Sequence, residues 1–179
     1  MRSRLGARTA LVAGAAFVAL TAVAAGAVKT AVYSRTLAKP ITDFHFTVAG
    51  VHVRARGRVK DVNASIRLNH TYTCDLDIGL VAPNGKAVTL SHDECTDLGA
   101  NFGTGPNSCK GKPTQFNDQA SRPISSGANP YSGPFKPEQP LALFKGSQTK
   151  GTWDFVVYDN TEEDTGKLGC VKLKIKRKT

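Results

Sequence analysis

The stretch GTWDFVVYD at residues 151–159 decides the fold class of this 179-residue chain. Its large apolar side chains, Trp153, Phe155 and Val157, occupy alternate positions and therefore share one face of an extended segment. A short acidic turn leads to a second alternating run, VKLKI at residues 171–175. The two runs predict a pair of half-buried antiparallel strands, with Trp153 as a buried aromatic anchor.

Similar alternation precedes this pair. Strands are predicted at residues 43–48, 51–59, 62–68, 74–81 and 87–90, the last two joined by a turn at Asn84-Gly85. Helical periodicity of useful length is absent from the sequence after residue 28, so the chain is predicted to be all-β. Residues 92–140 are rich in Gly, Pro, Asn and Ser, and a loop of that length is usually functional or held by crosslinks.

The first 27 residues have the pattern of a secretory signal peptide. Three arginines, Arg2, Arg4 and Arg8, precede an apolar run, and Ala25-Gly26-Ala27 is a small-residue cleavage motif. The alternative is an uncleaved, outward-facing membrane anchor, because the apolar run approaches the roughly 20 residues that span a bilayer. We expect residues 1–27 to be a signal peptide, 28–44 a lead-in, 45–179 one domain, and the protein to be secreted.

The charge of the chain is strongly basic. Removing the three arginines of the leader from a formal net charge of +10 leaves +7, and much of the excess lies in the lysines and arginine of residues 172–178. A solvated strand face that discourages edge pairing explains such a run, and attraction to an anionic surface polymer is the alternative. Nucleic acid is not expected as a partner, since no aromatic platform alternates with the basic residues.

Four cysteines, Cys74, Cys95, Cys109 and Cys170, predict two disulfides in an exported chain. Their spacing lacks Cys-x-x-Cys, which argues against a cysteine zinc site. Cys74 lies ten residues before Asn84 and Cys95 ten residues after Gly85, so a two-residue hairpin there would place these two cysteines opposite each other.

Taken together, these segments resemble the P domain (P/Homo B domain) that follows the catalytic domain of subtilisin-like proprotein convertases. The resemblance covers residues 45–175 and rests on the order and spacing of several short motifs. The matching residues are His70, Asp75-Leu76, Pro83 with Gly85, Phe116, Asp118, Ala120, Gly133, Phe135, Pro137 before Leu141, Gly151-Thr152-Trp153, Asp159, Asp164, Gly166 and Leu168.

This resemblance implies a jelly-roll β-sandwich of the galactose-binding-like, two-sheet kind. In that strand order the last strand lies beside the strand ending near His70, which implies a Cys74–Cys170 disulfide and leaves Cys95–Cys109 to close the glycine-rich loop. We favour this pairing over the hairpin alternative, which stays open. The resemblance also implies an accessory module that supports the folding, stability and calcium dependence of a protease.

Catalysis by the chain itself is not expected. No subtilisin-like catalytic domain and no Gly-x-Ser-x-Gly elbow is present in the sequence, and nothing ties His70 to a nucleophilic serine. The predicted function is therefore a non-catalytic accessory or binding module with a protease partner. The alternative is a cell-surface or glycan-binding sandwich that uses residues 92–140 and the basic last strand.

Acidic residues form the candidate metal site. Calcium prefers six to eight oxygen ligands from carboxylates and loop carbonyls, and the chain offers several aspartates near predicted turns. The candidate ligands are Asp75, Asp77, Asp118, Asp159 and Asp164. The alternative is structural, because aspartates commonly cap turns by accepting bonds from backbone amides.

Overall fold

The structure, a computed structural model, describes residues 26–94 and 99–179. Within these ranges nine strands and three single-turn 3-10 helices follow one another along the chain. The strands are β1 (Val28–Ile41), β2 (Phe46–Val53), β3 (Arg58–His70), β4 (Leu76–Val81), β5 (Ala87–His92), β6 (Thr114–Phe116), β7 (Gly133–Phe135), β8 (Gly151–Asp159) and β9 (Gly166–Lys178). The helices are η1 (Thr73–Asp75), η2 (Ile124–Ser126) and η3 (Leu141–Phe144). None of these helices is long and apolar enough to cross a membrane.

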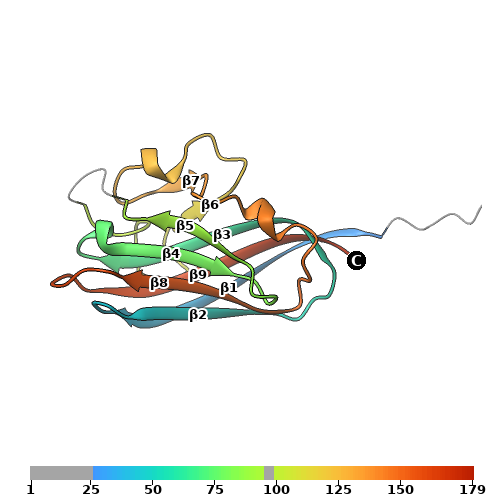
Figure 1. Cartoon of the computed structure of the whole chain (residues 1–179), viewed down its shortest axis with the longest axis horizontal. Helices are drawn as coiled ribbons and strands as arrows, with labels where there is room; N and C mark the ends of the chain where they lie inside the picture. The colour runs from blue at the N-terminus through green and yellow to red at the C-terminus, as the bar shows by residue number, and fades with distance from the viewer. Residues whose placement is uncertain (1–25, 95–98) are drawn as a thin grey trace, which may run out of the picture.

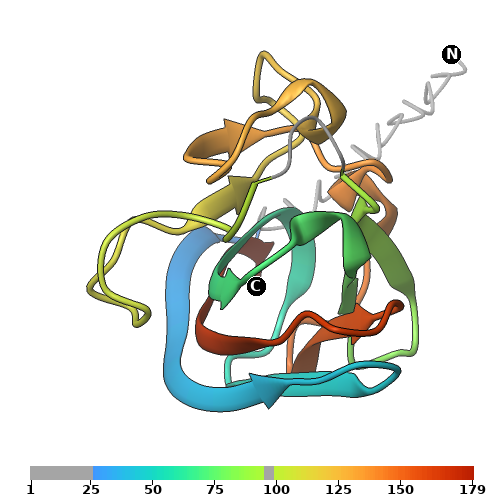
Figure 2. The same cartoon turned by 90° about the vertical axis from the view of Figure 1, so that its left-hand side faces the viewer.

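The strands form two sheets that face each other (Figures 1 and 2). Sheet A has the order β1-β9-β3-β6-β7, and sheet B has the order β2-β8-β4-β5. All pairs are antiparallel except β6 with β7. Without the short β7, the chain visits the two four-stranded sheets in the jelly-roll order. The all-β, two-sheet fold expected from the sequence is confirmed.

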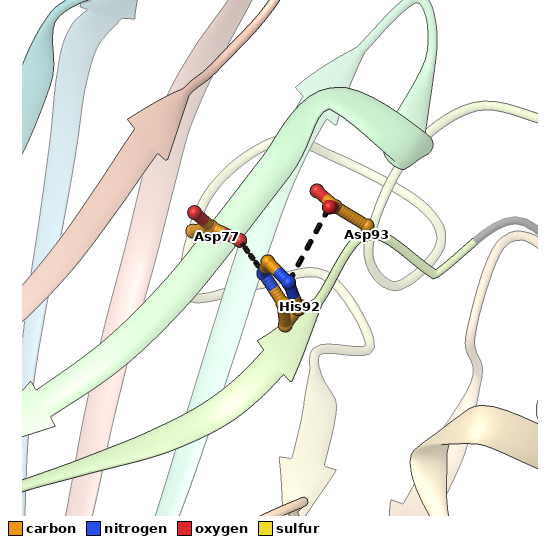
Figure 3. Close-up of side chains that lie close together, drawn as sticks. All are labelled: Asp77, His92 and Asp93. Carbon is orange, nitrogen blue, oxygen red and sulfur yellow. Dashed lines mark hydrogen bonds and ion pairs between the residues drawn. The ribbon is translucent and has the colours of Figure 1, made fainter.

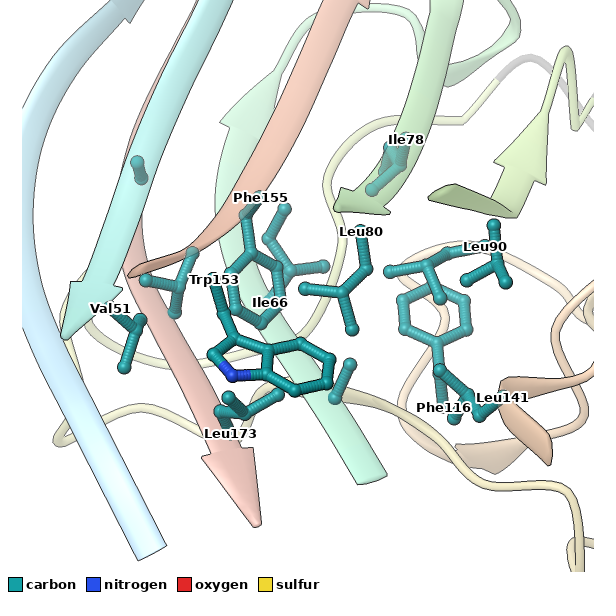
Figure 4. Packing of buried hydrophobic residues seen from close by; sticks show 14 of the residues in the cluster. Val51, Ile66, Ile78, Leu80, Leu90, Phe116, Leu141, Trp153, Phe155 and Leu173 are labelled. Atoms are coloured by element: carbon teal, nitrogen blue, oxygen red, sulfur yellow. The ribbon is translucent and has the colours of Figure 1, made fainter. Parts of the chain in front are cut away.

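The core lies between the two sheets and is built by the alternating side chains (Figure 4). Trp153 is fully buried, its indole N–H donates to the carbonyl of Thr149 at 3.0 Å, and its ring meets Phe144 edge-on with centroids 5.1 Å apart. Phe155 on the same strand and Leu173 on β9 are also fully buried. The prediction that Trp153 is a packing anchor is therefore confirmed.

The N-terminal boundary of the domain differs from the prediction. Residues 28–44 were expected to be a lead-in, but residues 28–41 form β1, which pairs with β9 from Val28 opposite Lys178 to Ile41 opposite Gly166. The strand is hard to recognise because most of its side chains are exposed, as is usual for an edge strand. The sandwich therefore begins at residue 28. The predicted signal peptide lies almost entirely outside the described residues.

A second difference concerns Gly50, which separated two predicted strands at residues 43–48 and 51–59. Strand β2 instead runs through Gly50, where a Cβ would lie within about 3 Å of the side chains of Thr152 and Asp154 on β8. The real break follows at Gly57, whose φ of +149° is unfavourable for residues with a side chain. A glycine is needed at position 50 because the side chains of β8 pack closely there, whereas a glycine is needed at position 57 because of its backbone conformation.

The disulfide pairing is corrected by the structure. Cys109 is bonded to Cys170, with Cα atoms 5.0 Å apart, which excludes both Cys74–Cys170 and Cys95–Cys109. Strand β9 does lie beside β3 as expected, but the register places Gly166 opposite His70 and Cys170 opposite Arg67. Cys170 therefore lies opposite the interior of β3. Cys74 comes after the end of β3, so the two cysteines are not side by side.

The other two cysteines are compatible with the hairpin alternative. Cys74 is also disulfide-bonded, whereas Cys95 lies outside the described residues. The Cys109–Cys170 bond attaches the long segment between β5 and β6 to the middle of sheet A, and β6 adds to the same sheet by pairing with β3. A disulfide therefore does hold residues 92–140, as expected, but it joins Cys109 to Cys170 rather than to Cys95.

Candidate functional site

A buried His–Asp pair closes one end of the sandwich. His70 ends β3 in sheet A and Asp159 ends β8 in sheet B, and the side chains of both are fully buried. His70 Nε2 lies 3.0 Å from Asp159 Oδ2, and His70 Nδ1 lies 2.5 Å from the carbonyl oxygen of Tyr72. The contact between His70 Nε2 and Asp159 Oδ2 therefore bridges the two sheets. With both ring nitrogens engaged and buried, His70 has a structural role.

Asp75 lies next to this pair. It is 4% exposed in η1, and one of its carboxylate oxygens, Oδ2, has no hydrogen-bond partner. Burial raises the pKa of Asp75 above its ordinary value; a hydrogen bond from Thr161 opposes this, and the nearby charges of Asp159 and Asp164 add to it. Asp75, Asp159 and Asp164 therefore form one acidic neighbourhood, and the backbone N–H of Asn160 also donates to the carbonyl of Asp75 at 2.8 Å.

The remaining two predicted ligands lie elsewhere. The carboxylate of Asp118 accepts the backbone N–H groups of Leu141 and Ala142, each at 2.8 Å, and so caps the start of η3. Asp77 lies on the opposite side of β4 from the buried residues and contacts His92. The five aspartates thus occupy three places. Calcium binding stays a prediction, restricted to the neighbourhood of Asp75, Asp159 and Asp164.

The outer face of sheet B carries a groove of about 530 Å³. Its aromatic wall is Phe46 on β2, 69% exposed, stacked on Tyr158 of β8 with ring centroids 4.5 Å apart. Gly79 of β4 contributes to the groove lining, and a Cβ there would meet only the carbonyl oxygen of Val88 at 3.5 Å. The hollow at this position therefore reflects a missing side chain rather than a strained backbone.

One end of the groove is polar, where Asp77, His92 and Asp93 come together (Figure 3). His92 Nδ1 contacts a carboxylate oxygen of Asp77, and His92 Nε2 lies 3.4 Å from Asp93 Oδ2. The hydrogen bond to Asp77, followed by the charges of Asp77 and Asp93, raises the pKa of His92. Of these three residues, only Asp77 was among the metal ligands predicted from the sequence. The facing positions of β4 and β5 around the Asn84-Gly85 turn were the signal that could have added His92.

Glu94 is a buried carboxyl group beside this cluster. It is 5% exposed, and its Oε1 has no hydrogen-bond partner. Burial, together with the charge of Glu138 and a hydrogen bond to it, raises the pKa of Glu94 to about 7, against the smaller opposing influence of His92. The folded protein therefore holds a proton on Glu94 at pH values where the unfolded chain has released it.

The proton held by Glu94 leads to a prediction about how the stability of the fold depends on pH. Between pH 4.5 and 7 the unfolded state binds fewer protons at this position than the folded state, so stability contributed by protonated Glu94 is lost as the pH rises. Compared with Glu94→Gln, the native protein should lose roughly 2–3 kcal/mol of unfolding free energy between pH 4.5 and 8. Urea unfolding of both proteins across this range tests it. Parallel pH profiles would show that Glu94 titrates normally.

Comparison with known proteins agrees with the fold and the two-sheet arrangement. The family model of the proprotein convertase P-domain matches residues 59–175, which is more than half of the chain. The protein belongs to this family of P domains. A comparison with curated protein sequences returns no match.

Two solved structures are similar to the chain in fold. One is the serine protease of Aeromonas sobria in complex with the chaperone ORF2, with a TM-score of 0.54 and 16% identity over 86% of this chain and 27% of that chain. The other is the serine protease of Aeromonas sobria alone, with a TM-score of 0.53 and 16% identity over 84% of this chain and 27% of that one. The chain thus spans about a quarter of the length of these proteases.

Proposed function

We propose that the protein is an exported, non-catalytic accessory module that binds a subtilisin-like serine protease and stabilises its folded form. The observation that carries this proposal is the P-domain family match over residues 59–175. The similarity of fold to a segment of a serine protease supports the same class of partner. Export agrees with the Cys109–Cys170 disulfide, since disulfides persist in oxidising compartments.

The outer face of sheet B is the surface that we assign to the protease. Exposed aromatic side chains next to an apolar hollow are the features that act as binding hot spots, and Phe46 with Tyr158 forms such a pair. On the described surface of sheet A, by contrast, the exposed apolar side chains of β1, Val28 and Val32, stand apart from any comparable aromatic pair.

The test uses a secreted subtilisin-like protease from the same organism, mixed with the purified protein. Phe46→Ser should weaken the binding of the protease by about tenfold or more and should abolish the increase in the protease's half-life at elevated temperature. Val32→Ser on the opposite sheet is the matched control, because Val32 is 62% exposed and should bind like the native protein. Equal binding by both variants would remove sheet B as the docking face, and no effect of the native protein on any such protease would contradict the function.

A second candidate function is attachment to an anionic cell-surface polymer. Lys172, Lys174 and Lys176 project from β9 on the outer side of sheet A, and no salt bridge with a carboxylate is found for them in the described part of the chain. Their charges are therefore free to attract a polyanion.

If Lys172, Lys174 and Lys176 bind a polyanion, the binding should depend on salt concentration. Replacing all three lysines by glutamine should lower the salt concentration at which the protein elutes from immobilised dextran sulfate, because exposed charges are screened within roughly 10 Å at 0.1 M salt. The control is Lys136→Gln with Lys145→Gln and Lys150→Gln, which changes the net charge equally at exposed positions away from β9. Equal elution of the two triple variants would attribute retention to net charge alone.

A further inference from the structure

The cluster of Asp77, His92 and Asp93 has the donors of a metal site. Each residue offers one ligand atom, and the three ligand atoms lie within 4.8 Å of one another. Figure 3 shows the two carboxylates on either side of the imidazole ring. In a tetrahedral zinc site with bonds of about 2.1 Å, neighbouring ligand atoms are about 3.4 Å apart. To reach that geometry, the widest separation between ligand atoms would shorten by up to about 1.4 Å and the Asp77–His92 contact would open.

The backbone brings these three residues together. Asp77 on β4 and His92 at the end of β5 are direct partners in the antiparallel ladder, so the sheet fixes their spacing. Asp93 follows with a φ of +46°, which turns its side chain back toward the ring of His92. Its other oxygen, Oδ1, accepts a hydrogen bond from the amide of Asn160 at 2.7 Å. Asn160 thus orients Asp93 as outer-shell residues orient metal ligands.

The charge around the cluster favours a cation. Glu138 Oε1 accepts the backbone N–H of His92 at 2.6 Å, and the buried carboxyl of Glu94 interacts with both Glu138 and His92. Glu94 also keeps one oxygen, Oε1, without a hydrogen-bond partner although the residue is 5% exposed. Three acidic residues, Asp77, Asp93 and Glu138, therefore surround one imidazole at this end of the groove, and a divalent ion would balance their negative charge.

We propose that Asp77, His92 and Asp93 bind a divalent first-row transition-metal ion, with zinc as the representative. One imidazole nitrogen and two carboxylate oxygens suit zinc and similar ions, whereas calcium requires six to eight oxygens. The side chains of His92 and Asp93 are 57% and 44% exposed, so the ring and one carboxylate can turn until a single ring nitrogen and both carboxylates face the ion. A fourth position stays open toward the groove for water or a ligand group from a partner.

The test is a titration of the purified full chain with zinc chloride at pH 7.5, followed by isothermal calorimetry and by thermal melts. The native protein should bind one zinc ion per chain, and its melting temperature should rise with the zinc concentration, because the ion binds only the folded state. Asp77→Asn, His92→Gln and Asp93→Asn should each weaken zinc binding at least tenfold. Cobalt, used as a probe in place of zinc, should give the visible absorption of a low-symmetry site in the native protein only.

The matched control is His52→Gln. His52 is an exposed histidine on β2 of the same sheet, near Thr152 and away from the cluster, so its removal should leave zinc binding unchanged. Melts without metal check that every variant folds. Binding lost equally in His52→Gln would mean adventitious surface binding, and zinc binding unchanged in the three cluster variants, or absent at 0.1 mM zinc in the native protein, would overturn the proposal.

Discussion

Replacing His70 by alanine is expected to lower the free energy of unfolding by about 3–5 kcal/mol. The imidazole of His70 and the carboxylate of Asp159 are fully buried and 3.0 Å apart, so the substitution leaves a buried carboxylate without its main partner. One oxygen of that carboxylate, Oδ1, already has no hydrogen bond. Asp159→Ala should cost a similar amount, and urea unfolding at pH 7 measures both.

A double-mutant cycle separates the pair from simple loss of volume. If the contact between the two side chains is responsible, the double variant His70→Ala with Asp159→Ala should be more stable than the sum of the two single losses predicts, by about 2 kcal/mol. His92→Ala is the control, since the exposed pair of His92 with Asp77 has the same chemistry and should contribute less than about 1 kcal/mol. Strict additivity in the cycle would show that each side chain acts independently.

The sequence was sufficient to predict the sheets where side chains alternate strongly. Strands β8 and β9 carry large apolar residues at every second position, and both lie in the core as expected. Strand β1 could not be recognised, because an edge strand buries few side chains and its pairing is decided by β9. Gly50 was misread for a related reason, since a glycine required by a neighbouring strand looks the same in sequence as a glycine that ends a strand.

The site was harder to predict because it depends on register and on contacts between the sheets. Asp75 and Asp77 both fall in the strand predicted at residues 74–81, two positions apart, where alternation would place them on one face. In the structure, however, Asp75 belongs to η1 and is buried, whereas Asp77 faces the groove. Asp159 was identified from its motif, yet its partner His70 lies 89 residues away on the other sheet. His92 and Asp93 have no motif of their own, and only the β4–β5 ladder places them beside Asp77.

Removing the Cys109–Cys170 disulfide is the second change with a large expected effect. The bond joins residues that are 61 positions apart, and closing a loop of that length in the unfolded chain corresponds to about 4 kcal/mol in the chain-entropy account. The double variant Cys109→Ala with Cys170→Ala should therefore lose roughly 2–4 kcal/mol of unfolding free energy. Replacing both cysteines together avoids a free thiol that could exchange with the disulfide of Cys74.

Reduction distinguishes the crosslink from the packing of the buried sulfur atom of Cys170. Under a reducing agent the native protein loses both disulfides and the double variant loses its remaining one, so any difference left between them comes from side-chain packing alone. If the crosslink accounts for the loss, the difference in unfolding free energy should fall to about 1 kcal/mol or less after reduction, which is what a small buried truncation costs. A difference that persists at its full size would mean that packing around Cys170, rather than the restricted unfolded state, stabilises this part of sheet A.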